Sequence, residues 1–187
     1  MNAVRVNARN RDFRKLSTHP NRPMHQAKTV PEIPRLKGER ERSFVFTEEL
    51  RKKYDDLAPE RLNSFIQFSC EIGICEREMI DLLKPDVHMT EKADEWGHYG
   101  YVHIRNGKTE FRKRSLPITA RAKGILTTWM PKSRSNFVFT REDAVSPVSA
   151  FTVIQQQERM RGLLNLPWDA CVHSARHTAL TSQGLRP

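Results

Sequence analysis

Several side chains in this 187-residue sequence are of the types that bind and break a phosphodiester bond. His173 and Arg176 stand three residues apart, and Lys108 lies in an earlier basic stretch. A planar guanidinium meets two non-bridging phosphate oxygens at once, which stabilises the charge that builds on them when a side-chain oxygen attacks. A lysine can donate a proton to the leaving 5′ oxygen, and a histidine can hydrogen-bond the same phosphate. Lys108, His173 and Arg176 are therefore the catalytic candidates, and this chemistry requires no metal and no cofactor.

Lys108 lies in a predicted β-hairpin. It follows Asn106-Gly107, a strong two-residue turn signal, between the strand-forming segments 99–104 and 111–118. A solvated turn lysine is the ordinary reading of such a position. The surrounding basic side chains favour contact with DNA instead, and the predicted DNA-binding set is Arg105, Arg112, Lys113 and Arg114.

The remaining patterns predict helices on both sides of this hairpin. Before the hairpin, the expected helices are 48–57, capped by Thr47; a second one, opened by Pro59 and ended by Gly73; and 76–84, ended by Pro85. After the hairpin, they are 119–130, closed by Pro131; one that starts at Ser146-Pro147 and runs through Leu164; and one from near His173 to Gly184. The predicted fold class is α+β, mainly helical, with helices around a small antiparallel sheet or hairpin. The predicted core positions are Leu62, Phe65, Ile66, Leu82, Leu83, Trp129, Phe151 and Leu163.

Three motifs in this order resemble the tyrosine recombinase, or phage integrase, family over roughly residues 36–187. That family has a G-x-R-x-x-E-x-x-x-L-x-x-x-D box, a hairpin lysine before an R-x-x-P strand, and an H-x-x-R-H-T box. The matching residues are Gly73, Glu78, Leu82 and Asp86, then Lys108, Arg114 and Pro117, then His173, Arg176, His177 and Thr178.

The resemblance implies the catalytic domain of a site-specific DNA recombinase or integrase. Such an enzyme cuts one strand of double-stranded DNA through a 3′-phosphotyrosyl link and rejoins it to another, in a homotetramer and without a cofactor. Lys108, His173 and Arg176 would be catalytic, with Glu78 and His177 in supporting positions.

The sequence departs from the family pattern in two places. Cys75 stands where the family has its first phosphate-binding arginine, and Arg77, two residues further along a helix, points about 200° away. The family's nucleophilic tyrosine follows the H-x-x-R box, whereas Tyr54, Tyr99 and Tyr101 all precede it. We therefore expect a truncated or degenerate copy that is inactive by itself.

Charge and composition divide the chain at about residue 43. Residues 1–43 hold 11 lysines and arginines, four acidic residues and four prolines, which predicts a flexible basic arm or linker. Residues 44–187 are the expected partial catalytic domain. The net charge of +10 favours a polyanionic partner. No apolar run long enough to span a membrane and no secretory signal is found, so a cytoplasmic location is expected.

Other interpretations remain open. A non-catalytic DNA-binding module is the main alternative. His173 and His177 have a zinc-compatible spacing, but no third ligand is indicated, which makes a metal-dependent nuclease the weaker candidate. Glu78 and Asp86 fit a helix surface and a helix exit better than an acid/base pair. The three cysteines are odd in number and lack C-x-x-C spacing, which indicates reduced thiols.

Overall fold

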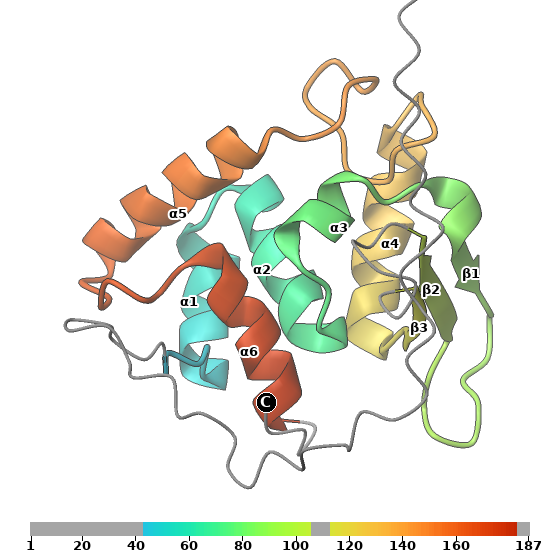
Figure 1. Cartoon of the computed structure of the whole chain (residues 1–187), viewed down its shortest axis with the longest axis horizontal. Coiled ribbons are helices and arrows are strands. Elements are labelled where there is room, and N and C mark those ends of the chain that lie inside the picture. The colour runs from blue at the N-terminus through green and yellow to red at the C-terminus, as the bar shows by residue number, and fades with distance from the viewer. Residues whose placement is uncertain (1–42, 106–112, 183–187) are drawn as a thin grey trace, which may run out of the picture. The chain divides into compact units, whose positions relative to one another are not determined.

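The computed structural model describes residues 43–105 and 113–182, which form six α-helices and a three-stranded antiparallel sheet (Figure 1). The helices are α1 (Glu48–Leu57), α2 (Glu60–Ile72), α3 (Glu76–Ile80), α4 (Ala120–Lys132), α5 (Ala150–Leu163) and α6 (Val172–Ser182). A short 3₁₀ helix, η1 (Lys84–Asp86), precedes the strands β1 (Val87–Met89), β2 (Gly100–Ile104) and β3 (Arg114–Pro117). This confirms the predicted class, mainly helical α+β.

Local signals place the first two helices where the sequence predicts them. The Thr47 side chain caps α1 by accepting a hydrogen bond from the backbone N–H of Leu50, at 3.3 Å. Gly73 ends α2 with a φ of 70°, the left-handed conformation that glycine adopts without steric cost. Helix α2 lies at the centre of the described residues and packs against α4 and α6 (Figure 1).

The sheet confirms the predicted hairpin strands and adds a third strand. Strand β2 pairs antiparallel with β1 on one side and β3 on the other, and Val102 faces Val87 and Leu116. The pairing of β2 with β3 runs as far as Ile104 and Arg114. The hairpin tip, with Lys108 and Arg112, lies outside the described residues, as do residues 1–42 of the predicted arm and Gly184.

The helix predicted over 76–84 is shorter than expected. Helix α3 ends at Ile80, and the chain then pairs with a distant segment. The N–H of Val138 donates to the carbonyl of Leu82 at 3.0 Å, and the N–H of Lys84 donates to the carbonyl of Asn136 at 2.7 Å. These long-range backbone bonds replace the last helical turns, and Pro85 falls inside η1. Leu83, predicted as core, is only half-buried. Helix α4 also differs, since it includes Pro131 in its last turn.

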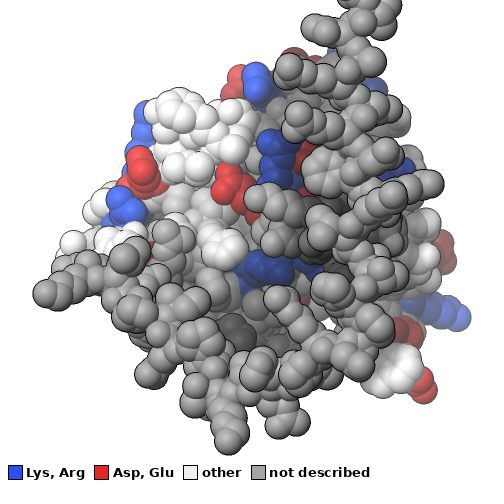
Figure 2. Space-filling view, viewed as in Figure 1, with Lys and Arg blue, Asp and Glu red and all other residues white. Residues whose placement is uncertain are grey.

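Helix α5 begins later than the Ser146-Pro147 signal predicts. Pro147 forms a bridge with Thr140, and the N–H of Val148 donates to the carbonyl of Phe139 at 3.2 Å, so the helix starts only at Ala150. The prediction that Phe151 and Leu163 are core residues is wrong, because they are 67% and 66% exposed. Uncharged surface gathers where α5 lies, at the upper left of Figure 2. Within the described residues, no helix is long and apolar enough to span a membrane.

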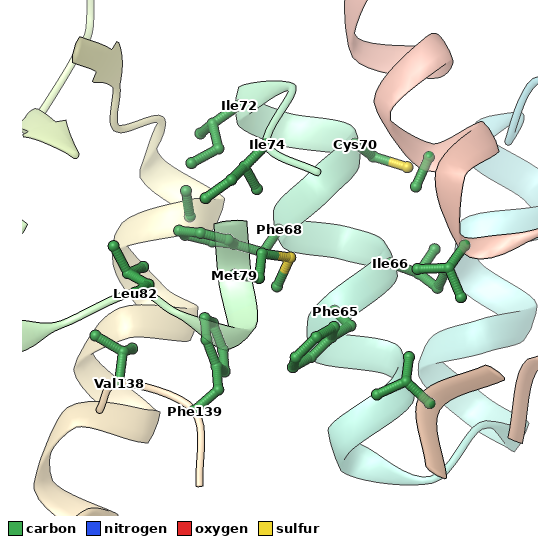
Figure 3. Close-up of a cluster of buried hydrophobic side chains, with 14 of the residues drawn as sticks. Phe65, Ile66, Phe68, Cys70, Ile72, Ile74, Met79, Leu82, Val138 and Phe139 are labelled. Atoms are coloured by element: carbon green, nitrogen blue, oxygen red, sulfur yellow. The ribbon is translucent and has the colours of Figure 1, made fainter. Parts of the chain in front are cut away.

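The core forms around α2 and includes the segment that follows α4 (Figure 3). Phe139 is fully buried, and its ring centroid lies 5.1 Å from that of Phe65, 5.5 Å from Phe68 and 5.7 Å from Trp129. The contacts with Phe65 and Phe68 are edge-on and that with Trp129 is tilted, and such contacts add to the stabilisation that comes from burying the rings. The core therefore fixes α3, which carries Met79, and the start of the sheet relative to α2.

Gly100 is required where β2 meets β1, and we expect Gly100→Ala to lower the free energy of unfolding by about 2–4 kcal/mol. Its φ is 96°, and an added Cβ would lie 1.9 Å from the carbonyl oxygen of His88. Gly124→Ala in α4 is the matched control, because a Cβ there meets no described atom within 4 Å apart from its own helix backbone. The control should raise stability by roughly 0.5–1 kcal/mol in urea unfolding. Equal midpoints for the two variants would contradict the described strand pairing.

Candidate functional site

Helix α6 carries two of the predicted catalytic residues in its first two turns. His173 is exposed, and its ring packs edge-on against that of His177, with centroids 5.0 Å apart and planes at 83°. Arg176 lies on the next turn, with a side chain that is 28% exposed and reaches toward α3. Its Nη1 lies 3.5 Å from Oε2 of Glu78. The H-x-x-R motif is thus joined to the first motif through a carboxylate.

Glu78 is the junction of three elements. Its two carboxylate oxygens accept a bidentate pair of hydrogen bonds from Nη1 and Nη2 of Arg114 in β3, each at 2.8 Å. Oε2 also accepts from the backbone N–H of Cys75 at 3.0 Å, which caps the start of α3. Because Arg176 approaches the same oxygen, this one side chain links α3, β3 and α6.

Charge at this junction is shared between one carboxylate and two guanidinium groups. Burial acts to raise the pKa of Glu78, but the hydrogen bonds from Arg114 and from the Cys75 backbone outweigh it and hold that pKa below its usual range. Burial is the main cause that raises the pKa of the Cys75 thiol, so the thiol is neutral at pH 7. Glu78, Arg114 and Arg176 together carry one net positive charge, which suits an anion.

Solved structures share this arrangement of elements. The Tn1549 transposon integrase in complex with circular intermediate DNA matches with a TM-score of 0.61 and 17% identity, over 81% of this chain and 58% of that chain. A lambda integrase dimer bound to a COC' core site matches with a TM-score of 0.58 and 15% identity, over 76% and 53%. XerA recombinase matches with a TM-score of 0.57 and 13% identity, over 75% and 50%. All three are tyrosine recombinases.

The chain has the tyrosine recombinase catalytic-domain fold. It spans between 50% and 58% of the length of these three recombinase structures. No family model and no curated protein matches the sequence. The recombinase likeness is therefore one of fold, at identities of 13% to 17%.

Of the predicted DNA-binding residues of the hairpin that the structure describes, two arginines pair with acidic residues and the lysine is exposed. The Arg105 guanidinium, at the end of β2, pairs with the buried carboxylate of Asp86. Lys113 is exposed beside β3, while Arg114 turns inward to Glu78. Each acidic residue of the first motif thus holds an arginine of the hairpin. In the described part of the chain, no group of three His, Cys, Asp or Glu side chains is placed to hold a metal ion.

The start of α6 is held by a residue that the motifs did not identify. The carboxylate of Asp169 accepts hydrogen bonds from the backbone N–H groups of Ser43 and Phe44, both at 3.1 Å. Its backbone carbonyl accepts from Oγ of Ser174 at 2.6 Å. Further along, Oγ1 of Thr178 accepts from the N–H of Phe46 at 2.9 Å. The helix that bears the H-x-x-R motif is therefore tied to the point where the chain enters the fold.

Proposed function

We propose that this chain is the DNA phosphate-binding part of a site-specific tyrosine recombinase. The observation that carries the proposal is the meeting of Arg176, Arg114 and Glu78 in a fold shared with recombinases, two of which were solved bound to DNA. The proposed partner is double-stranded DNA. The complete enzyme would act as a homotetramer in the cytoplasm without a cofactor.

In the proposed reaction, Arg176 binds the non-bridging oxygens of the phosphate to be cut, and His173, exposed on the same helix face, hydrogen-bonds the same group. A tyrosine hydroxyl attacks phosphorus and gives up its proton to His173, so a 3′-phosphotyrosyl bond forms and the bond to the 5′ oxygen breaks. Lys108 supplies the proton that the leaving oxygen takes up. Rejoining reverses these steps, and because the covalent intermediate keeps the bond energy, no nucleotide triphosphate is consumed.

Tyr54 is not suited to be that nucleophile. It is fully buried in α1, and its hydroxyl donates a hydrogen bond to Oε1 of Gln157 at 3.1 Å. Burial raises the pKa of Tyr54 to about 12, which further disfavours the phenolate.

A non-catalytic DNA-binding module is the second candidate, and Cys75 favours it. A neutral thiol at the position of the motif's arginine removes a preorganised donor, a loss that typically costs about 10²- to 10³-fold in rate. A longer protein that contains this chain would be incubated with a nicked duplex and run on a denaturing gel. A covalent protein–DNA band would support the recombinase, and no band even with Cys75→Arg would leave the binding module.

Arg176→Ala is expected to weaken binding to a mixed-sequence duplex roughly tenfold to hundredfold, since a charge-assisted contact to phosphate is lost. In a fluorescence anisotropy titration between about 50 and 200 mM KCl, the slope of log K against log salt should become shallower by about 0.9, the value for one phosphate contact. Arg77→Ala is the control, because the Arg77 side chain is 78% exposed on α3 and pairs with Asp81. Identical slopes for Arg176→Ala and Arg77→Ala would overturn the proposed function.

A further inference from the structure

Helix α6 presents two faces with different surroundings. His173 and Arg176, three positions apart, share the face from which Arg176 reaches Glu78. Ser174 and Thr178, four positions apart, lie on the buried face. Arg176 is two positions from each of these buried residues, which corresponds to about 200° around a helix. A contact that fixes the rotation of the buried face therefore also fixes the direction in which the Arg176 side chain leaves the helix.

The buried face is held by an entry segment, which begins at Ser43 and ends at Phe46. The N–H groups of Ser43 and Phe44 donate to Oδ2 of Asp169, each at 3.1 Å. The N–H of Phe46 donates to Oγ1 of Thr178 at 2.9 Å. These side-chain oxygens take the place that the carbonyl groups of a neighbouring strand have in a sheet. The entry segment is thus fastened both to the turn before α6 and to the helix itself.

Asp169 is the residue through which the entry segment holds the start of α6. Its carboxylate is 7% exposed, and a buried carboxylate is costly unless donors or opposite charges stabilise it. Its backbone carbonyl accepts a hydrogen bond from Oγ of Ser174, in the first turn of the helix, at 2.6 Å. From α5, Nε2 of Gln157 donates to the carbonyl of Ala170 at 2.8 Å. The turn that carries Asp169 therefore joins the entry segment, α5 and α6 just before the H-x-x-R motif.

We propose that Asp169 is a positioning residue for DNA binding. Its hydrogen bonds to the entry segment set the rotation of α6 and thereby place Arg176 at the DNA phosphate. This inference rests on the proposed function and adds a residue that lies outside all three motifs. The negative charge of Asp169 opposes the binding of DNA, so its contribution comes from the placement of another residue.

Asp169→Ala and Asp169→Asn separate the position of this side chain from its charge. Both variants raise the net charge of the protein equally, but only asparagine keeps an oxygen that can accept both N–H groups. If Asp169 acted through its charge alone, both variants would bind DNA equally, and more tightly than the unaltered protein. A mixed-sequence duplex is the probe in a salt titration, after thermal melting has shown that each variant is folded at the temperature used.

Asp169→Ala is expected to bind the duplex roughly tenfold more weakly than Asp169→Asn, because the Arg176 contact with phosphate is lost. The slope of log K against log salt should be shallower by about 0.9. In the free protein, the ¹H–¹⁵N signal of the Arg176 Nε–H should move in Asp169→Ala and keep its position in Asp169→Asn. A merely structural role would lower the melting temperature and change neither the slope nor this signal.

Ser43→Pro tests the same contact from the other side if Asp169→Ala does not fold. Proline lacks the N–H that Ser43 donates to Asp169, and the substitution changes no residue of α6 and no charge. It should weaken duplex binding by about threefold, since the N–H of Phe44 still donates to the same oxygen. Ser43→Ala is the matched control, because it removes the exposed hydroxyl and keeps the N–H.

Equal binding by Asp169→Ala and Asp169→Asn would overturn the role of Asp169, provided that Arg176→Ala still weakens binding. The same conclusion would follow from equal binding by Ser43→Pro and Ser43→Ala where the first pair cannot be compared. Either result keeps the proposed function. If Arg176→Ala has no effect on duplex binding, the proposed function itself fails.

Discussion

Glu78→Ala is expected to lower the free energy of unfolding by about 2–4 kcal/mol, because it removes a partly buried ion pair and a helix cap together. The variant leaves Arg114 and Arg176 without their shared carboxylate and the Cys75 N–H without its cap. Urea unfolding at pH 7 measures the loss. An unfolding midpoint equal to that of the unaltered protein would show that the junction of α3, β3 and α6 is not formed in solution.

The same carboxylate predicts a dependence of stability on pH. The pKa of Glu78 is lowered in the folded chain, so its contribution is present above the ordinary value of 4.5 and is lost as the pH falls through the lower, folded pKa. Glu78→Gln lacks this titration. The difference in stability between the unaltered protein and Glu78→Gln should therefore shrink between pH 7 and about pH 3.5. A constant difference over that range would contradict the ion pair.

Phe139→Ala is expected to lower the free energy of unfolding by about 3–5 kcal/mol, because it leaves a cavity against three aromatic rings. That loss is comparable with the whole stability of many domains, so the variant should be partly unfolded at 37 °C. Thermal melting followed by circular dichroism gives the measurement.

Phe151→Ala is the matched control for that prediction. It deletes the same side chain from the exposed face of α5, where Phe151 is 67% exposed, and it should change stability by less than about 0.5 kcal/mol. If Phe151→Ala lowered the stability by several kcal/mol and Phe139→Ala did not, Phe151 rather than Phe139 would lie in the core, which would contradict the described position of α5.

Elements whose signals are local could be predicted from the sequence. The Thr47 side chain caps α1 by accepting a hydrogen bond from the N–H of Leu50, three residues later, and Gly73 ends α2 because its backbone adopts the left-handed conformation. Strand β2 likewise follows from the strand-forming residues Tyr101, Val102 and Ile104 ahead of a turn signal, and β3 is the strand that returns after that turn. Such features depend on a cap, a terminating glycine or a turn signal that lies next to the element, so the local sequence contains what decides them.

Features decided by pairing or packing with another segment, without a turn or cap signal in the sequence, could not be predicted in this way. Pro147 follows a serine as it would at a helix start, yet backbone pairing with Thr140 keeps it extended. Phe151 is apolar and at helical spacing, but periodicity does not tell which face of α5 the core covers.

The site shows the same division. The chemistry of the residue types, together with the resemblance of three motifs to recombinase motifs, indicated His173 and Arg176 and gave Glu78 a supporting place. The bidentate pairing of Glu78 with Arg114, 36 positions away, needed the fold to be seen. Asp169 left no signal at all, because its partners are backbone N–H groups about 125 positions earlier.

The central claim is that DNA binds at the meeting of α3, β3 and α6 and not merely on the basic residues 1–43. The most direct measurement is the ¹H–¹⁵N spectrum of the arginine Nε–H groups, recorded while a duplex of about 20 base pairs is added. The signals of Arg176 and Arg114 should shift together in proportion to bound DNA, while that of Arg121, paired with Glu48 and Asp55 between α4 and α1, should not. Shifts confined to arginines of residues 1–43 would contradict the claim.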